Sequence, residues 1–105
     1  MARPGSTIIT HATFRQYSGI TPAAFDALIG RKSEIETLIR KVPGFVQYDL
    51  VRTTDGMTTL TVCNDPAGTE ASNKQVATWI GQNLPALQTS PPVVTGGEDV
   101  LHFMA

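Results

Sequence analysis

The chain has 105 residues, 41% of them hydrophobic and 16% charged, a composition that predicts a single globular domain rather than a disordered segment. Its formal net charge of −1 at pH 7 gives no electrostatic basis for binding nucleic acid or an anionic membrane surface. One cysteine excludes an intramolecular disulfide and a cysteine-based zinc site, and the lack of a long apolar run or signal peptide predicts a cytoplasmic protein.

The chain is expected to be one domain, residues 1–105, in which residues 1–6 form a flexible leader. The β-branched run from Thr7 to Phe14 predicts the first strand. Apolar residues, such as the neighbours Ile8 and Ile9, occupy both alternating sets of positions. We therefore expect neither face of this strand to be committed to water.

Residues 16–20 predict a loop, and the first helix is expected to begin at Thr21-Pro22. Threonine is a favourable N-cap, and proline is favourable at the first position of a helix. The helix is expected to continue to about residue 42. One narrow stripe of its surface is apolar and is predicted to face the core: Phe25, Leu28, Ile35, Ile39 and Val42.

Gly30 lies in the middle of this helix and weakens it by about 1 kcal/mol relative to alanine. The spacing of Ser33 and Glu36 could start a second helix there. We favour one continuous helix, because the apolar stripe keeps its phase across the glycine. Lys32 falls inside the stripe, where its side chain either reaches the rim to meet water, the commoner arrangement, or places a charge over a cavity.

Residues 43–65 predict a β-hairpin in which two β-rich runs are joined at Thr54-Asp55-Gly56. A two-residue Asp-Gly loop would mix apolar and polar residues on each face. A three-residue loop, with Gly56 in the left-handed conformation as a bulge, pairs Leu50 with Leu60. Register follows the hydrophobic pattern, so we predict this second pairing. One face then carries Val46, Tyr48, Leu50, Leu60 and Val62.

Asp65-Pro66 again combines a capping residue with a first-turn proline, and it predicts a second helix that ends at about Leu84. Asn73 lies in the middle of the inner side of this helix, where a buried amide must find hydrogen-bond partners or water. Trp79 lies at the border of that side. The apolar residues that mark the inner side are Val76, Ile80, Leu84 and Leu87.

A last strand is expected from Val93 to Met104, interrupted at Gly96-Gly97 by a bulge or a very short hairpin. The order of elements predicts an α+β, ferredoxin-like βαββαβ fold, a four-stranded antiparallel sheet with two helices on one face. Val100 and Leu101 again place apolar residues on both faces. We therefore expect the open face to be covered, most simply by a second copy about a two-fold axis.

Several short segments of the sequence are similar to those of a known protein family: Pro43-Gly44-Phe45, the Asp55-Gly56 turn, Glu70-x-Ser72-Asn73, Trp79-Ile80 and Pro91-Pro92. Over roughly residues 7–104 the chain resembles the dimeric α+β barrel superfamily, and within it the antibiotic-biosynthesis-monooxygenase-like domains. The resemblance implies a homodimer with one cavity per subunit between the sheet and the helices. Characterised members include cofactor-independent monooxygenases that oxidise electron-rich aromatic substrates, and haem-degrading enzymes.

The haem-degrading pattern requires an asparagine on the first strand and a tryptophan followed by a histidine on or after the second helix. Here the first strand offers His11 instead, and no histidine lies between Trp79 and Leu101. The resemblance therefore favours oxygenase chemistry over haem degradation. In that branch Trp79 and Asn73 would correspond by type and helix to the residues that position the substrate.

Five residues are predicted to form the site. His11 is the acid–base candidate, because histidine titrates near neutral pH, and Arg15 on the same strand face could hold an anionic oxygen. Asn73 and Trp79, also predicted to be catalytic, would hold the substrate anion and its ring. Tyr48 would line the pocket and bind substrate.

No third ligand with suitable spacing accompanies His11 and His102, so no metal site is predicted, and no cofactor is expected. The predicted function is that of a cofactor-independent monooxygenase acting on a small aromatic or quinol-type substrate. The alternative is a non-catalytic homodimer that binds a small hydrophobic molecule in the same cavity, or serves as a scaffold, without acid–base chemistry.

Overall fold

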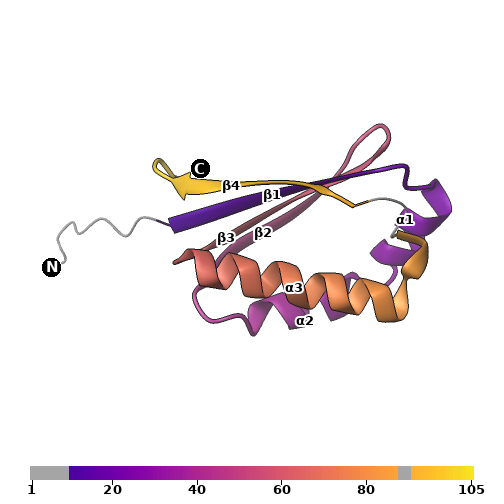
Figure 1. Cartoon of the computed structure of the whole chain (residues 1–105), viewed down its shortest axis with the longest axis horizontal. Helices are drawn as coiled ribbons and strands as arrows, with labels where there is room; N and C mark the ends of the chain where they lie inside the picture. Colours follow the sequence, from indigo (N-terminus) through magenta and orange to yellow (C-terminus); the bar gives the residue numbers. More distant parts are fainter. Residues whose placement is uncertain (1–9, 88–90) are drawn as a thin grey trace, which may run out of the picture.

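A four-stranded antiparallel sheet, with strand order β2-β3-β1-β4, carries the helices on one of its faces (Figure 1). The computed structural model describes residues 10–87 and 91–105. Its elements are β1 (Thr10–Ser18), α1 (Pro22–Ile29), α2 (Lys32–Arg40), β2 (Phe45–Arg52), β3 (Gly56–Cys63), α3 (Pro66–Asn83), the 3-10 turn η1 (Pro85–Leu87) and β4 (Val93–Asp99). The predicted α+β, ferredoxin-like architecture is therefore confirmed.

The first strand extends further toward the C-terminus than predicted. The leader, the predicted strand start at Thr7, and Ile8 and Ile9 lie outside the described residues. At its other end β1 continues to Ser18, beyond the predicted end at Phe14. In the described ranges no helix is both long and apolar enough to cross a membrane.

Both predicted helix starts are confirmed by their caps. The Thr21 hydroxyl accepts a hydrogen bond of 3.2 Å from the Ala24 N–H, and the Asp65 carboxylate accepts one of 2.9 Å from the Gly68 N–H. Each cap is followed by a proline that cannot donate a hydrogen bond and therefore leaves no unpaired N–H. The predicted apolar stripe is also confirmed as buried: Phe25, Leu28, Ile35, Ile39 and Val42.

The prediction of one helix over residues 22–42 is wrong, because α1 and α2 are separate helices that meet at Gly30 and Arg31. Arg31 leaves the helical conformation, with φ −119° and ψ 20°. Its guanidinium group donates two hydrogen bonds of 2.7 Å to the Glu34 carboxylate and one of 3.1 Å to Asn83 on α3. The break is thus accompanied by a contact with α3 that the apolar stripe does not predict.

The hairpin formed by β2 and β3 has a different register from the predicted one. Leu50 pairs with Thr59 and Tyr48 pairs with Thr61, so each partner is shifted by one residue. The two threonines are buried against the helices. The residues that face the open side instead include Leu60 and Val62. The prediction failed because it assumed one apolar face, whereas both faces of β3 carry residues that avoid water.

Gly56 explains why the predicted loop does not form. Its φ is not positive, and it is a buried residue of β3 rather than a turn residue. A Cβ atom at this position would lie 2.0 Å from the carbonyl oxygen of Tyr17 on β1. The loop therefore shortens to Thr54 and Asp55, and the Thr53 N–H donates a hydrogen bond of 3.0 Å to the Gly56 carbonyl. The irregularity in pairing lies at the other end of β2.

The last strand is continuous, so the predicted interruption is wrong. Gly96 and Gly97 pair with β1 in regular antiparallel register, and the strand ends at Asp99 rather than at Met104. Gly96 is next to the imidazole of His11, because a Cβ atom there would lie 3.3 Å from the ring carbon Cε1. The absence of a side chain at this position makes room for the histidine ring and does not bend the strand.

Replacing Gly56 with alanine is expected to destabilise the protein by about 2–3 kcal/mol, because the added methyl group would overlap the backbone of Tyr17. Gly97→Ala is the matched control, since a Cβ atom there meets nothing within 4 Å. Urea unfolding followed by circular dichroism measures the free energy of unfolding of both variants. Equal values for the two would contradict the close contact between β3 and β1.

Candidate functional site

His11 is held by α3 on the helix-facing side of β1. Its ring atom Nδ1 lies 2.8 Å from the hydroxyl oxygen of Thr69, and that hydroxyl donates a hydrogen bond of 3.0 Å to the carbonyl oxygen of Pro66. A hydroxyl has one proton, so Thr69 must accept its other hydrogen bond from the Nδ1–H of His11. The neutral imidazole then carries its lone pair on Nε2, which becomes the atom that can take a proton.

The His11 ring lines a groove of about 460 Å³ between α3 and the β1–β4 edge of the sheet. Thr13 and Arg15 join it from β1, since every second side chain of a strand points to the same face. Thr69 and Asn73 join it from α3, since residues four apart lie on the same face of a helix. The groove therefore contains three of the five predicted site residues.

Arg15 and Asn73 provide polar groups that are free to act on a ligand. The Nε of Arg15 donates a hydrogen bond of 3.0 Å to the Tyr17 hydroxyl, which orients the guanidinium group. Its terminal nitrogens can then bind an anion. Asn73 is half-buried, and its amide makes no hydrogen bond within the described part of the chain. Together these groups could hold an oxygen atom on which negative charge develops.

Trp79 is placed elsewhere and does not line this groove. Its ring lies 5.0 Å from the guanidinium carbon of Arg31, and its carbonyl accepts a hydrogen bond of 2.9 Å from the Asn83 amide. The hydrogen bond from Arg31 also lowers the pKa of the neighbouring Glu34 carboxyl below its usual value. Trp79 therefore belongs to the contact between α2 and α3.

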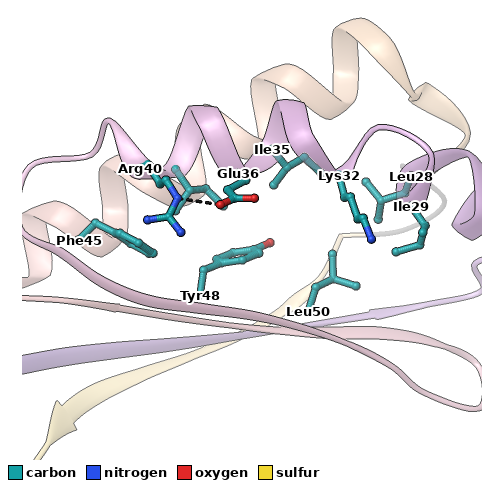
Figure 2. A pocket seen from close by; sticks show the side chains of 10 residues that line it. Leu28, Ile29, Lys32, Ile35, Glu36, Arg40, Phe45, Tyr48 and Leu50 are labelled. Carbon is teal, nitrogen blue, oxygen red and sulfur yellow. Dashed lines mark hydrogen bonds and ion pairs between the residues drawn. The ribbon is translucent and has the colours of Figure 1, made fainter.

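Tyr48 lines a second hollow, between α2 and β2 at the opposite edge of the sheet (Figure 2). Burial raises the pKa of its hydroxyl well above the usual value, and the nearby Tyr17 raises it further. Tyr48 therefore remains a neutral phenol that can donate or accept a hydrogen bond but cannot act as a base at neutral pH. The structure thus separates Tyr48 from His11, which the sequence had assigned to one cavity.

Thr69 is the residue of the groove that sequence reasoning missed. The spacing in the sequence indicated this residue, since Thr69 lies four residues before Asn73 and the two therefore share a helix face. A polar pair on the inner side of a helix is expensive unless it meets a polar partner on the opposing element. Here that partner is His11.

Solved structures that resemble this chain include a protein of unknown function from Nitrosomonas europaea, with a TM-score of 0.75 and 19% identity over 93% of this chain and 96% of that one. A monooxygenase from Streptomyces coelicolor, in complex with nanaomycin D, has a TM-score of 0.64 and 16% identity over 93% of each chain. A Bordetella bronchiseptica protein, provisionally assigned as an antibiotic biosynthesis monooxygenase, has a TM-score of 0.69 and 13% identity over 89% of this chain and 99% of that one.

These likenesses confirm the expected α+β, ferredoxin-like fold, which the chain shares with solved structures that include proteins assigned as antibiotic biosynthesis monooxygenases. At this level of sequence identity they show the fold alone. No protein-family profile and no curated protein sequence matches the chain.

Thr69→Val is expected to release the His11 ring, so that the neutral imidazole changes from one tautomer to a mixture of two. Valine cannot accept the Nδ1–H hydrogen bond that selects the tautomer. The chemical shifts of the two ring nitrogens, measured by NMR on the neutral imidazole, distinguish the tautomers. Thr37→Val is the matched control, because the Thr37 hydroxyl also donates a 3.0 Å hydrogen bond to a backbone carbonyl but is exposed on α2. A wild-type ring protonated on Nε2 would contradict the assignment.

Proposed function

We propose that this protein is a homodimeric, cofactor-independent monooxygenase that oxidises a small phenolic or quinol-type aromatic molecule. One observation carries the proposal. In the described part of the chain, a histidine whose Nε2 makes no hydrogen bond, a guanidinium group and an amide without a hydrogen bond line the same groove. The likeness to the Streptomyces coelicolor monooxygenase in complex with nanaomycin D supports this class of reaction and substrate.

In the proposed reaction His11 takes the phenolic proton on Nε2, while Thr69 keeps the ring oriented through Nδ1. Arg15 and Asn73 stabilise the resulting phenolate oxygen. Neither Trp79 nor Tyr48 lines the groove, so neither touches the substrate in this scheme.

The phenolate itself supplies the electrons that reduce dioxygen, because protein side chains handle oxygen poorly. For a phenol with a free ring carbon, one oxygen atom becomes the second quinone oxygen. The other leaves as water with the phenolic hydrogen and the displaced ring hydrogen. Four electrons leave the substrate and reduce one dioxygen molecule completely, so no external reductant is needed.

The homodimer is proposed from the open face of the sheet. Three of its apolar side chains are strongly exposed in the single chain: Phe14 is 45% exposed, Val51 55% and Val93 63%. Exposed apolar side chains on one face of a sheet are typical of an interaction surface, and a second copy across a two-fold axis would cover them. The helix side, which carries both hollows, would remain free.

A non-catalytic ligand-binding protein is the second candidate, because the rim of the His11 groove is exposed at Glu70 and Lys74. A site that handles a reactive oxygen intermediate normally excludes water. A protein of this second kind would bind an aromatic molecule without consuming oxygen. The assay for the first candidate therefore also decides between the two.

The wild-type protein is expected to oxidise 1,5-dihydroxynaphthalene to 5-hydroxy-1,4-naphthoquinone, consuming one molecule of dioxygen for each quinone formed. His11→Gln should lower the rate by about 10²-fold or more, since it removes the general base. An oxygen electrode combined with quinone absorbance measures both quantities.

His102→Gln is the matched control for this assay, because His102 is the other histidine and lies outside the groove. Catalase should not return oxygen to the solution, since the balanced reaction releases water and not hydrogen peroxide. Binding of the naphthalenediol with no oxygen consumption would contradict the oxygenase and support the second candidate.

Phe14→Glu is expected to convert the dimer to a monomer, because it places a charge on the open face between β3 and β4. Sedimentation velocity measures the change. Ile29→Glu is the matched control, since Ile29 is 39% exposed but lies on the helix side. A monomeric wild-type protein at micromolar concentration would contradict the proposed dimer.

A further inference from the structure

The hollow beneath α2 has the size and walls of a site for a small molecule. Its volume is about 380 Å³, within the range of roughly 300–1,000 Å³ that is usual for ligand pockets. Leu28 and Ile35 form its helical wall, and Phe45, Tyr48 and Leu50 form its floor on β2 (Figure 2). The two aromatic rings on the floor could pack against the ring of a planar ligand.

Among the described residues, the charged side chains around this hollow include one cation, Lys32, without a partner. Glu36 and Arg40 neutralise each other through an ion pair of 2.8 Å. Lys32 reaches over the hollow from α2, and in the described part of the chain it makes no ion pair or hydrogen bond (Figure 2). Lys32 is also the first residue of α2, where the helix dipole adds a partial positive charge. The side chains that line the hollow therefore carry one net positive charge, that of Lys32, above an apolar floor.

Tyr48 adds a hydrogen-bonding group near the middle of the floor. Its hydroxyl stays protonated because burial raises its pKa, so it adds no negative charge to the hollow. The arrangement is therefore apolar on the sheet side, neutral at Tyr48 and positive at Lys32. A neutral apolar molecule would leave Lys32 unpaired, and a cation would be repelled by it.

We propose that the hollow beneath α2 is a binding site for a small molecule that joins an aromatic body to one anionic group, such as an aromatic carboxylate. The aromatic body lies against Phe45 and Tyr48, and the carboxylate pairs with Lys32 at the open end. This site is separate from the His11 groove and does not depend on the oxygenase proposal.

Titration of the whole protein with 2-naphthoate, followed by backbone amide NMR shifts, tests the site. Saturable shifts are expected at Ile35, Tyr48 and Leu50. Lys32→Met should raise the Kd about tenfold, since it removes a charge-assisted contact while keeping the length and apolar character of the side chain. The neutral analogue 2-naphthalenemethanol should bind more weakly to the wild type and be indifferent to Lys32→Met.

Two lysines serve as matched controls. Lys41→Met removes the same charge just past the end of α2, and Lys74→Met removes it from the rim of the His11 groove. Each should change the Kd for 2-naphthoate by less than about twofold. An unchanged Kd for Lys32→Met, or a loss of affinity caused by Lys74→Met, would overturn the proposal. So would the absence of saturation at millimolar 2-naphthoate. None of these outcomes bears on oxygen consumption at His11, so the two proposals can fail separately.

Discussion

The antiparallel pairing of β1 with β3 decides which side chains of this protein meet the helices. Gly56 sets one end of that pairing, opposite Ser18, because the backbone of Tyr17 takes the space that a side chain would need. The alternation of the strand then places Arg15 and His11 on the helix side. A shift of one residue would move both to the open face, and the groove would lose its imidazole and its guanidinium group.

The sequence predicted those features of the fold that depend on local chemistry. Thr21 and Asp65 cap helices where expected, because a short polar side chain followed by proline satisfies the first turn without help from the rest of the chain. Two features depend on tertiary contacts and were not predictable in this way. Arg31 leaves its helix where it binds Asn83, and Gly56 serves a contact between strands although Asp-Gly is typical of a turn.

The sequence predicted those residues of the candidate site whose placement depends only on strand or helix periodicity. His11 and Arg15 are two strand positions of equal parity, four apart, so the sequence alone places them on one face. Asn73 joins them because it lies on the inner side of α3, as predicted. Tyr48 lies on the same face but on β2, at the opposite edge of the sheet. Its position depends on the order and register of the strands, which the pattern of apolar residues left ambiguous.

Both hollows lie on the helical side of the sheet, at its two opposite edges, with the buried core between them. Any assembly built on the open face would leave each subunit's recognition surfaces complete and turned outward. Substitutions in one hollow would leave the walls of the other intact, since none of the described side chains lines both. The two hollows are therefore separate at the level of sheet edges, and the residues that line one can change without altering the other or the open face.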